Sequence, residues 1–305
     1  MLQDYAYVNT RIRAMIPMLL KREEIETLIN ARNFSEYLGY LSKNYRELSS
    51  SIEIKDLENS LRKNLSDTFS TIIAYSSENS SSLLRCLSKR YEIENTKITL
   101  RSKEGEKKRE EIISMLQEKY NLDVEEDASL LDIEVSLDRY YFSRLQSSIT
   151  KLCREDRRIA SVLVSMWIDT LNIPMILRLA TKKEDKFIIP NGSLSREVMD
   201  ECLSLGNIHE IVSRLSNTMY GETLRASLNE YKRSNSLMNF EINLKRFFID
   251  RSYRIMRKNM LNIGLILGFL VLKTNEIENL RAIGTGISEG LNRNEIREMV
   301  VMPPN

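Results

Sequence analysis

Two stretches decide how this chain is organised: YEIENTKITLRSK, which runs from Tyr91, and NEIENLRAIGTG, which runs from Asn275. Both contain the letters E-I-E-N, followed each time by an apolar run. A third stretch, DTLNIPMILR from Asp169, keeps the pattern of an acid, two other residues, an asparagine and an apolar run. Internal similarity of this kind indicates that the chain is built from copies of one unit.

The spacing upstream of each copy supports the repeat. In every copy a glutamate that follows an apolar residue lies 37 or 38 residues before the asparagine. In the first two copies an arginine follows the asparagine by six residues, as Arg101 and Arg178, whereas Thr285 takes that position in the third. The glutamate and asparagine pairs are Glu58 with Asn95, Glu134 with Asn172, and Glu241 with Asn279.

A second similarity agrees with the first. LKREEIETLINARNFSEYLGYLS from Leu20 aligns without a gap with LSREVMDECLSLGNIHEIVSRLS from Leu194. From the apolar residue just before each repeated glutamate, apolar residues recur every three or four positions, which is typical of amphipathic helices that bury one face. In the first copy these residues are Leu57, Leu61, Leu65, Phe69 and Ile72.

Composition favours an all-α protein. The chain has 305 residues, of which only 10 are glycine and 5 proline, so the turns that a sheet-rich fold requires are scarce. We predict three similar helical domains, at residues 1–103, 104–189 and 190–305. The charged segment RSKEGEKKRE from Arg101 and the segment KKEDKFIIPNG from Lys182 would connect them.

No catalytic, cofactor-binding or metal-binding residue is expected. The three cysteines are far apart, there is one histidine, and neither a P-loop nor a zinc or EF-hand pattern occurs. A net charge of +2 argues against a broad nucleic-acid-binding face. The apolar stretch at residues 261–272 is too short to cross a bilayer, which takes about 20 residues; we expect a buried helix and no transmembrane segment.

Two sets of polar residues are candidates for interactions. Asn95, Asn172 and Asn279 either line a common axis or, as we expect, bond backbone and side chains between helices. Arg101 and Arg178 accompany the first two of them. Arg251, Arg254 and Lys258 place three cations on one helix face, which is either simply solvated or contacts anionic lipid or an acidic partner.

The whole chain resembles the C subunit of the archaeal and bacterial V/A-type ATP synthases, a relative of the d subunit in eukaryotic V-ATPases. It opens with YAYVNTRIR from Tyr5, close to the start typical of that family. The segment FIIPNG from Phe187 is similar to the one that opens the family's third unit. The region from Asn279 through Gly290 to Glu298 is similar to its C-terminal signature.

This resemblance implies a fold, a location and partners. The family fold is three helical domains around a pseudo-threefold axis, forming a funnel. The protein would sit peripherally on the cytoplasmic side of the cell membrane, as a non-catalytic socket between the proteolipid (c/K) ring and the central-stalk subunits D and F. It would carry torque that links proton or sodium transport to ATP synthesis or hydrolysis, without a cofactor, nucleic acid or small-molecule substrate.

Two other interpretations stay open at the level of sequence. The repeats could stack in a line and form a free-standing scaffold that binds peptides or proteins. Alternatively, carboxylates in a helical bundle could form an enzyme site. The second alternative lacks the Glu-x-x-His pairs that di-iron bundles use, because the chain has a single histidine, His209.

Overall fold

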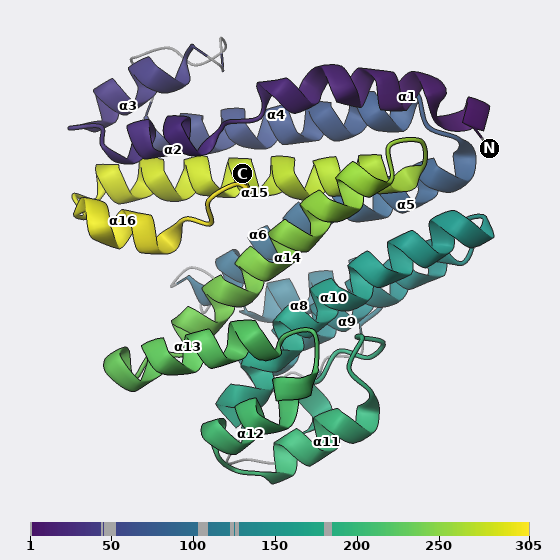
Figure 1. The fold of residues 1–305 in the computed structure, drawn as a ribbon, viewed down its shortest axis with the longest axis vertical. Coiled ribbons are helices and arrows are strands. Elements are labelled where there is room, and N and C mark those ends of the chain that lie inside the picture. Colours follow the sequence, from purple (N-terminus) through teal and green to yellow (C-terminus); the bar gives the residue numbers. More distant parts are fainter. Residues whose placement is uncertain are drawn as a thin grey trace. The chain divides into compact units, whose positions relative to one another are not determined.

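The computed structural model describes residues 2–43, 45, 53–102, 109–122, 125, 128–179 and 185–304, and it is built from helices (Figure 1). No strand occurs among these residues, so the all-α prediction is confirmed. The chain divides into two compact units. Unit 1 combines Met1–Ser77 with Ile242–Asn305, and unit 2 is the continuous segment Glu78–Glu241.

Unit 1 is formed by the two ends of the chain. Helix α14 (Met238–Lys258) begins in unit 2 and continues into unit 1 after Glu241. The other helices of unit 1 are α1 (Leu2–Met15), the 3-10 turn η1 (Ile16–Met18), α2 (Arg22–Ile29), α3 (Phe34–Leu41), α4 (Ile54–Ala74), α15 (Ile263–Ser288) and α16 (Arg293–Met299).

Unit 2 contains the middle of the chain. Its helices are α5 (Glu78–Ser88), α6 (Arg90–Arg101), α8 (Arg109–Tyr120), α9 (Leu130–Ile149), α10 (Arg154–Leu179), η2 (Asp185–Phe187), α11 (Arg196–Ser204), α12 (Ile208–Arg214), η3 (Leu215–Asn217) and α13 (Gly221–Ser234).

The core of unit 1 lies along α15, which runs beside α4. Asn262 caps the helix by accepting a hydrogen bond from the Gly264 N–H, and every residue from Ile263 to Leu270 is buried. The prediction of a buried apolar helix is therefore confirmed from Ile263 onward. Leu261, just before the cap, is 59% exposed instead.

The core of unit 2 contains a largely buried cation, Arg90, whose side chain is 16% exposed. Helices α5, α6 and α10 pack against α9, and the Arg90 guanidinium lies between 5.2 and 5.6 Å from the ring centres of Tyr141, Phe142 and Trp167. Its Nη1 donates to Asp138 Oδ1 at 2.6 Å. The carboxylate and the aromatic faces together compensate for the water that Arg90 loses on burial.

The predicted repeats can be followed in the helices. The second and third copies of the acid-x-x-Asn pattern lie on α10 and α15, each 26 residues long, whereas the first lies on α6, which is separated from α5 at Lys89. The boundary predicted between residues 103 and 104 falls outside the described residues. The division into three domains, the pseudo-threefold axis and the funnel stay predictions.

Among the residues that the structure describes, one helix meets the length and composition required to span a membrane. It is α10, and 61% of its most apolar 18-residue window is buried within the protein. Core helices of proteins that never enter a bilayer also meet this requirement, so the feature is weak evidence for a membrane span.

Helices α14 and α15 approach so closely at Gly268 that a side chain does not fit. A Cβ atom there would lie 2.5 Å from Met256 Cβ and 2.7 Å from the Ser252 carbonyl oxygen. We expect Gly268→Ala to lower the free energy of unfolding by about 1–3 kcal/mol, because the helices must separate. Urea denaturation of the full chain measures this.

The matched control is Gly39→Ala, also in a helix, where no heavy atom of the described residues outside the helix's own nearby backbone lies within 4 Å of the added Cβ. Alanine restricts the unfolded chain more than glycine, so this variant should be more stable by about 0.5–1 kcal/mol. Equal effects of the two substitutions would contradict the close approach at Gly268.

Candidate functional site

The repeated glutamates and arginines meet as ion pairs. Arg101 donates from Nε and Nη2 to the two carboxylate oxygens of Glu134 at 2.5 and 2.6 Å, a bidentate arrangement. Arg178 likewise pairs with Glu241. In each case the arginine belongs to one predicted repeat and the glutamate to the next.

The third pair uses an arginine at a different position. Thr285 stands where the repeat spacing placed a basic residue, but Glu58 is paired with Arg281 Nε at 2.8 Å. Arg281 precedes Thr285 by four residues, about one turn of α15, and so lies on the same face of the helix. The missing arginine is therefore replaced from one turn away, and the third predicted repeat pairs with the first.

The acid of the third copy, Glu276, accepts hydrogen bonds from residues of the N-terminal part of unit 1. Its Oε2 accepts from the backbone N–H of Leu20 at 2.5 Å, and its Oε1 accepts from Tyr45 Oη at 2.5 Å and from Lys273 Nζ at 2.6 Å. The Glu276 side chain is 5% exposed. Burial, followed by the charge of Glu276, raises the pKa of the Tyr45 hydroxyl, so this tyrosine stays a donor.

The acid of the second copy, Asp169, forms the same arrangement in unit 2. Its Oδ2 accepts from the backbone N–H groups of Ser193 and Leu194 at 2.9 and 3.2 Å, and from Tyr220 Oη at 2.9 Å. Gly192 allows the close approach, since a Cβ there would lie 2.0 Å from Asp169 Oδ1. We call the contacts of Glu276 and Asp169 the two acid latches.

The two latches join two signals that the sequence showed separately. Leu20 and Leu194 occupy equivalent positions in the gapless alignment, and each donates its N–H to the acid of an acid-x-x-Asn copy. Sequence reasoning missed Tyr45 and Tyr220. They are 175 residues apart, whereas the alignment pairs residues that are 174 apart, such as Leu20 and Leu194.

The repeated asparagines hold extended backbone. Asn172 Nδ2 donates to the Ile189 carbonyl at 2.8 Å, and its Oδ1 accepts from the Ile189 N–H at 2.9 Å. Asn279 does the same with Val301, at 2.7 and 3.1 Å. Both asparagines are at most 2% exposed. In these two copies the side-chain amide therefore forms the pair of backbone hydrogen bonds that a neighbouring β-strand would otherwise form. We call these contacts the asparagine clamps.

The first copy differs. Asn95 is half-buried, and no comparable backbone clamp is found for it among the described residues. Its acid, Glu92, is 58% exposed and faces Lys119 Nζ at 3.5 Å. The neighbouring Tyr120 hydroxyl is buried, with no hydrogen-bond partner in the described part of the chain. Within the described ranges, Glu92 therefore forms no acid latch like the other two.

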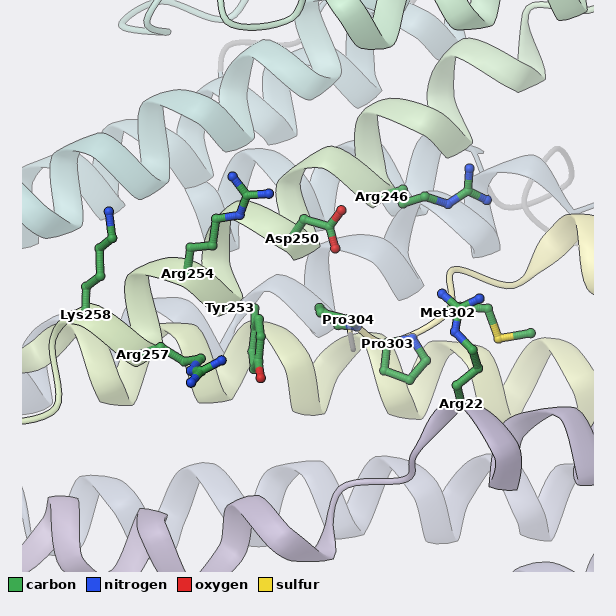
Figure 2. A pocket seen from close by; sticks show the side chains of 10 residues that line it. All are labelled: Arg22, Arg246, Asp250, Tyr253, Arg254, Arg257, Lys258, Met302, Pro303 and Pro304. Carbon is green, nitrogen blue, oxygen red and sulfur yellow. The ribbon is translucent and has the colours of Figure 1, made fainter.

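A basic pocket of about 600 Å³ lies in unit 1 (Figure 2). One side of it is a face of α14, and the other sides are the start of α2 and the tail after α16. No ion pair joins any of its five cations to a carboxylate within the described ranges. Its lining residues are Arg22, Arg246, Asp250, Tyr253, Arg254, Arg257, Lys258, Met302, Pro303 and Pro304.

The predicted cationic stripe is divided by this pocket. Arg254 and Lys258 line it, whereas Arg251 is not among its lining residues and lies with its guanidinium 5.2 Å from the Phe247 ring centre. Sequence reasoning missed Arg22, which reaches the pocket from α2 more than 200 positions away in the chain. Among the described residues, no group of three or more His, Cys, Asp or Glu side chains could hold a metal ion.

Comparison with known families agrees with this architecture. The model of the ATP synthase (C/AC39) subunit family matches residues 8–123 and 114–299, which is most of the chain. The chain belongs to the ATP synthase C/AC39 subunit family. The resemblance to the C subunit of the V/A-type ATP synthases, which rested on short motifs and spacing, is thereby confirmed.

Relatives in this family align over nearly the full chain. The C subunit of the A-type ATP synthase of Methanocaldococcus jannaschii is 26% identical, covering 98% of this chain and 87% of its own length. The corresponding proteins of Pyrococcus abyssi and Methanosarcina mazei are 25% and 26% identical, covering 97% and 98% of this chain and 90% and 93% of their own lengths.

The asparagine clamps should matter for stability only where they are formed. Asn279→Ala leaves the buried N–H of Val301 without its partner, while the Val301 carbonyl still accepts from Asn275 Nδ2 at 2.9 Å. We therefore expect a loss of about 1–3 kcal/mol of unfolding free energy. The matched control, Asn95→Ala, should cost less than about 1 kcal/mol. Chemical denaturation of both variants tests the difference, and similar losses would contradict it.

The Asp169 latch should make stability depend on pH. Burial raises the pKa of the Asp169 carboxyl, and the hydrogen bonds from Ser193, Tyr220 and the backbone only partly oppose this effect. The folded state therefore binds this proton more tightly than the unfolded state, so the contribution of Asp169 to stability is greatest at low pH. It is lost as the pH rises from the ordinary carboxyl value through the raised one.

Asp169→Asn removes this titration. Measured by urea denaturation between about pH 4 and 8, the stability of the variant relative to the original protein should increase with pH over that window and then stay level. A difference that does not change with pH would show that the pKa of Asp169 is not raised in the folded state.

Proposed function

We propose that the chain is a non-catalytic central-stalk component of an A-type ATP synthase. In this role it connects the axle of subunits D and F to the proteolipid ring on the cytoplasmic side of the membrane. Torque passing through it links ion translocation to ATP synthesis or hydrolysis. Family membership and the names of the relatives, each the C subunit of an A-type ATP synthase, support this proposal.

The observation that carries the proposal furthest is the pairing of the last predicted repeat with the first. In unit 1, α15 packs against α4, Arg281 pairs with Glu58, and Glu276 latches Leu20. In a linear array of repeats each repeat touches only its neighbours, so the terminal repeats do not meet. The contacts therefore favour a closed socket over the alternative of a free-standing linear scaffold.

A torque-carrying adaptor must also resist deformation. Close-packed interiors transmit strain because their side chains have few alternative arrangements. The acid latches and asparagine clamps add directional hydrogen bonds to this packing, and each has buried groups that water cannot satisfy. These features suit a part that joins two others and performs no chemistry.

The first test is co-sedimentation of the purified full chain with the D–F axle and the detergent-solubilised proteolipid ring of its own organism. We expect the chain to bind each alone and to bridge the two, so that axle sediments with ring only when the chain is present. The control is the same mixture without the chain. Binding to neither component would remove the adaptor function.

A further inference from the structure

We propose that the basic pocket of unit 1 is the docking site for an acidic helix of another protein of the synthase. This inference rests on the proposed function, because it assumes that the chain works within that complex. The family match assigns no residue of this chain to any contact. The pocket itself is defined by residues from three segments (Figure 2).

The charge of the pocket is not used inside the protein. Arg22, Arg246, Arg254, Arg257 and Lys258 are all exposed, and none of them pairs with a carboxylate in the described part of the chain. Arg257 lies 5.7 Å from the Tyr253 ring centre, which orders its guanidinium but leaves its charge unbalanced. A concave surface with a net excess of cations concentrates an anionic partner and directs its approach.

The shape of the site indicates an elongated ligand. The cations on α14 extend from Arg246 to Lys258, about 18 Å along the helix axis at the usual rise. One compact anion would contact only one end of this row. A helix laid along α14 can place carboxylates one and two turns apart and so meet several cations together. Four of the five cations are arginines, whose guanidinium forks match carboxylates in a bidentate geometry.

The apolar residues of the pocket favour a protein partner over a lipid surface. Tyr253, Met302, Pro303 and Pro304 line the pocket and are only partly exposed. A segment that binds a bilayer presents apolar side chains that protrude and insert between lipids. Partly buried ones instead provide a surface for the methylene groups of glutamates and the aliphatic residues of a helix.

Asp250 is the one acid that lines the pocket in the described part of the chain. It stands one turn from Arg246 and one turn from Arg254 along α14, and it repels an acidic helix in the same place where those arginines attract it. Removing its charge should therefore strengthen docking. This opposite sign separates a specific electrostatic contact from general damage to the fold.

The test titrates the full chain and its charge variants against the D–F axle and, separately, against the detergent-solubilised ring. We expect Arg257→Glu and Arg22→Glu, on different helices, each to weaken binding to one of these partners about tenfold or more at low salt. Asp250→Asn should tighten binding to the same partner about two- to fivefold. Added salt should reduce all of these differences, because the cations are exposed.

Arg251→Glu is the matched control. It makes the same change of charge on α14, but it lies about 120° around the helix from Arg257 and outside the pocket. It should change affinity less than about twofold. Equal loss with Arg251→Glu and Arg257→Glu would overturn the inference, since net charge rather than the pocket would then control binding.

A carbodiimide cross-link identifies the occupant, because the reagent joins an amine directly to a carboxylate. In the bound complex, Lys258 should become linked to an Asp or Glu in a partner segment with further acids at helical spacing. No link from Lys258, a link to a segment without that pattern, or a second copy of this chain as the linked partner would each overturn the inference.

Vesicles containing anionic lipid provide the remaining arm. Suppose that the original protein binds these vesicles, and that Arg257→Glu abolishes this binding but leaves binding to the axle and the ring unchanged. That result would assign the pocket to lipid and overturn the inference. If the original protein bridges axle and ring but no pocket variant alters either affinity, the adaptor function stands and the docking site is wrong. If it binds neither, both proposals fail.

Discussion

The fold depends on buried carboxylates that receive backbone N–H groups from distant parts of the chain. Glu276 and Asp169 lie inside their units and would be costly there without partners. Each accepts hydrogen bonds from backbone N–H groups just before a helix and from a tyrosine hydroxyl, although Asp169 Oδ1 has no partner among the described residues. The dependence is mutual, because removing the acid would leave those backbone groups buried and unpaired. The helices on either side can therefore occupy only one register.

The exposed ion pairs have a different role. In the Arg281–Glu58 pair the two side chains are 37% and 36% exposed, and exposed pairs of this kind each contribute about 0–1 kcal/mol. These ion pairs help to determine which helices pack against each other. The acid latches, the asparagine clamps and the apolar core provide most of the free energy of folding. Because such pairs contribute little to stability, an arginine one turn away can serve the third repeat at a cost of no more than about 1 kcal/mol.

Sequence patterns located most of the important residues but not their contacts. Glu58, Glu134 and Glu241 mark the repeats, and spacing alone gives no sign that they pair with arginines of the preceding copy. Counting residues along the chain does not find Arg281, because it lies four residues from the expected position. A shift of four residues nevertheless keeps a side chain on the same face of a helix. Arg22 and Tyr45 cannot be assigned from sequence, because their roles depend on tertiary packing across more than 200 positions.

The discontinuity of unit 1 has a consequence for biosynthesis. Residues 2–77 emerge from the ribosome before α15, yet α4 and Leu20 have their partners on α15, more than 180 residues further along the chain. At ordinary translation rates this interval lasts on the order of ten seconds or more. Unit 2, being continuous, can fold during that time. Until α15 has been made, the apolar face of α4 lacks its main partner, so the N-terminal part of unit 1 completes its packing late.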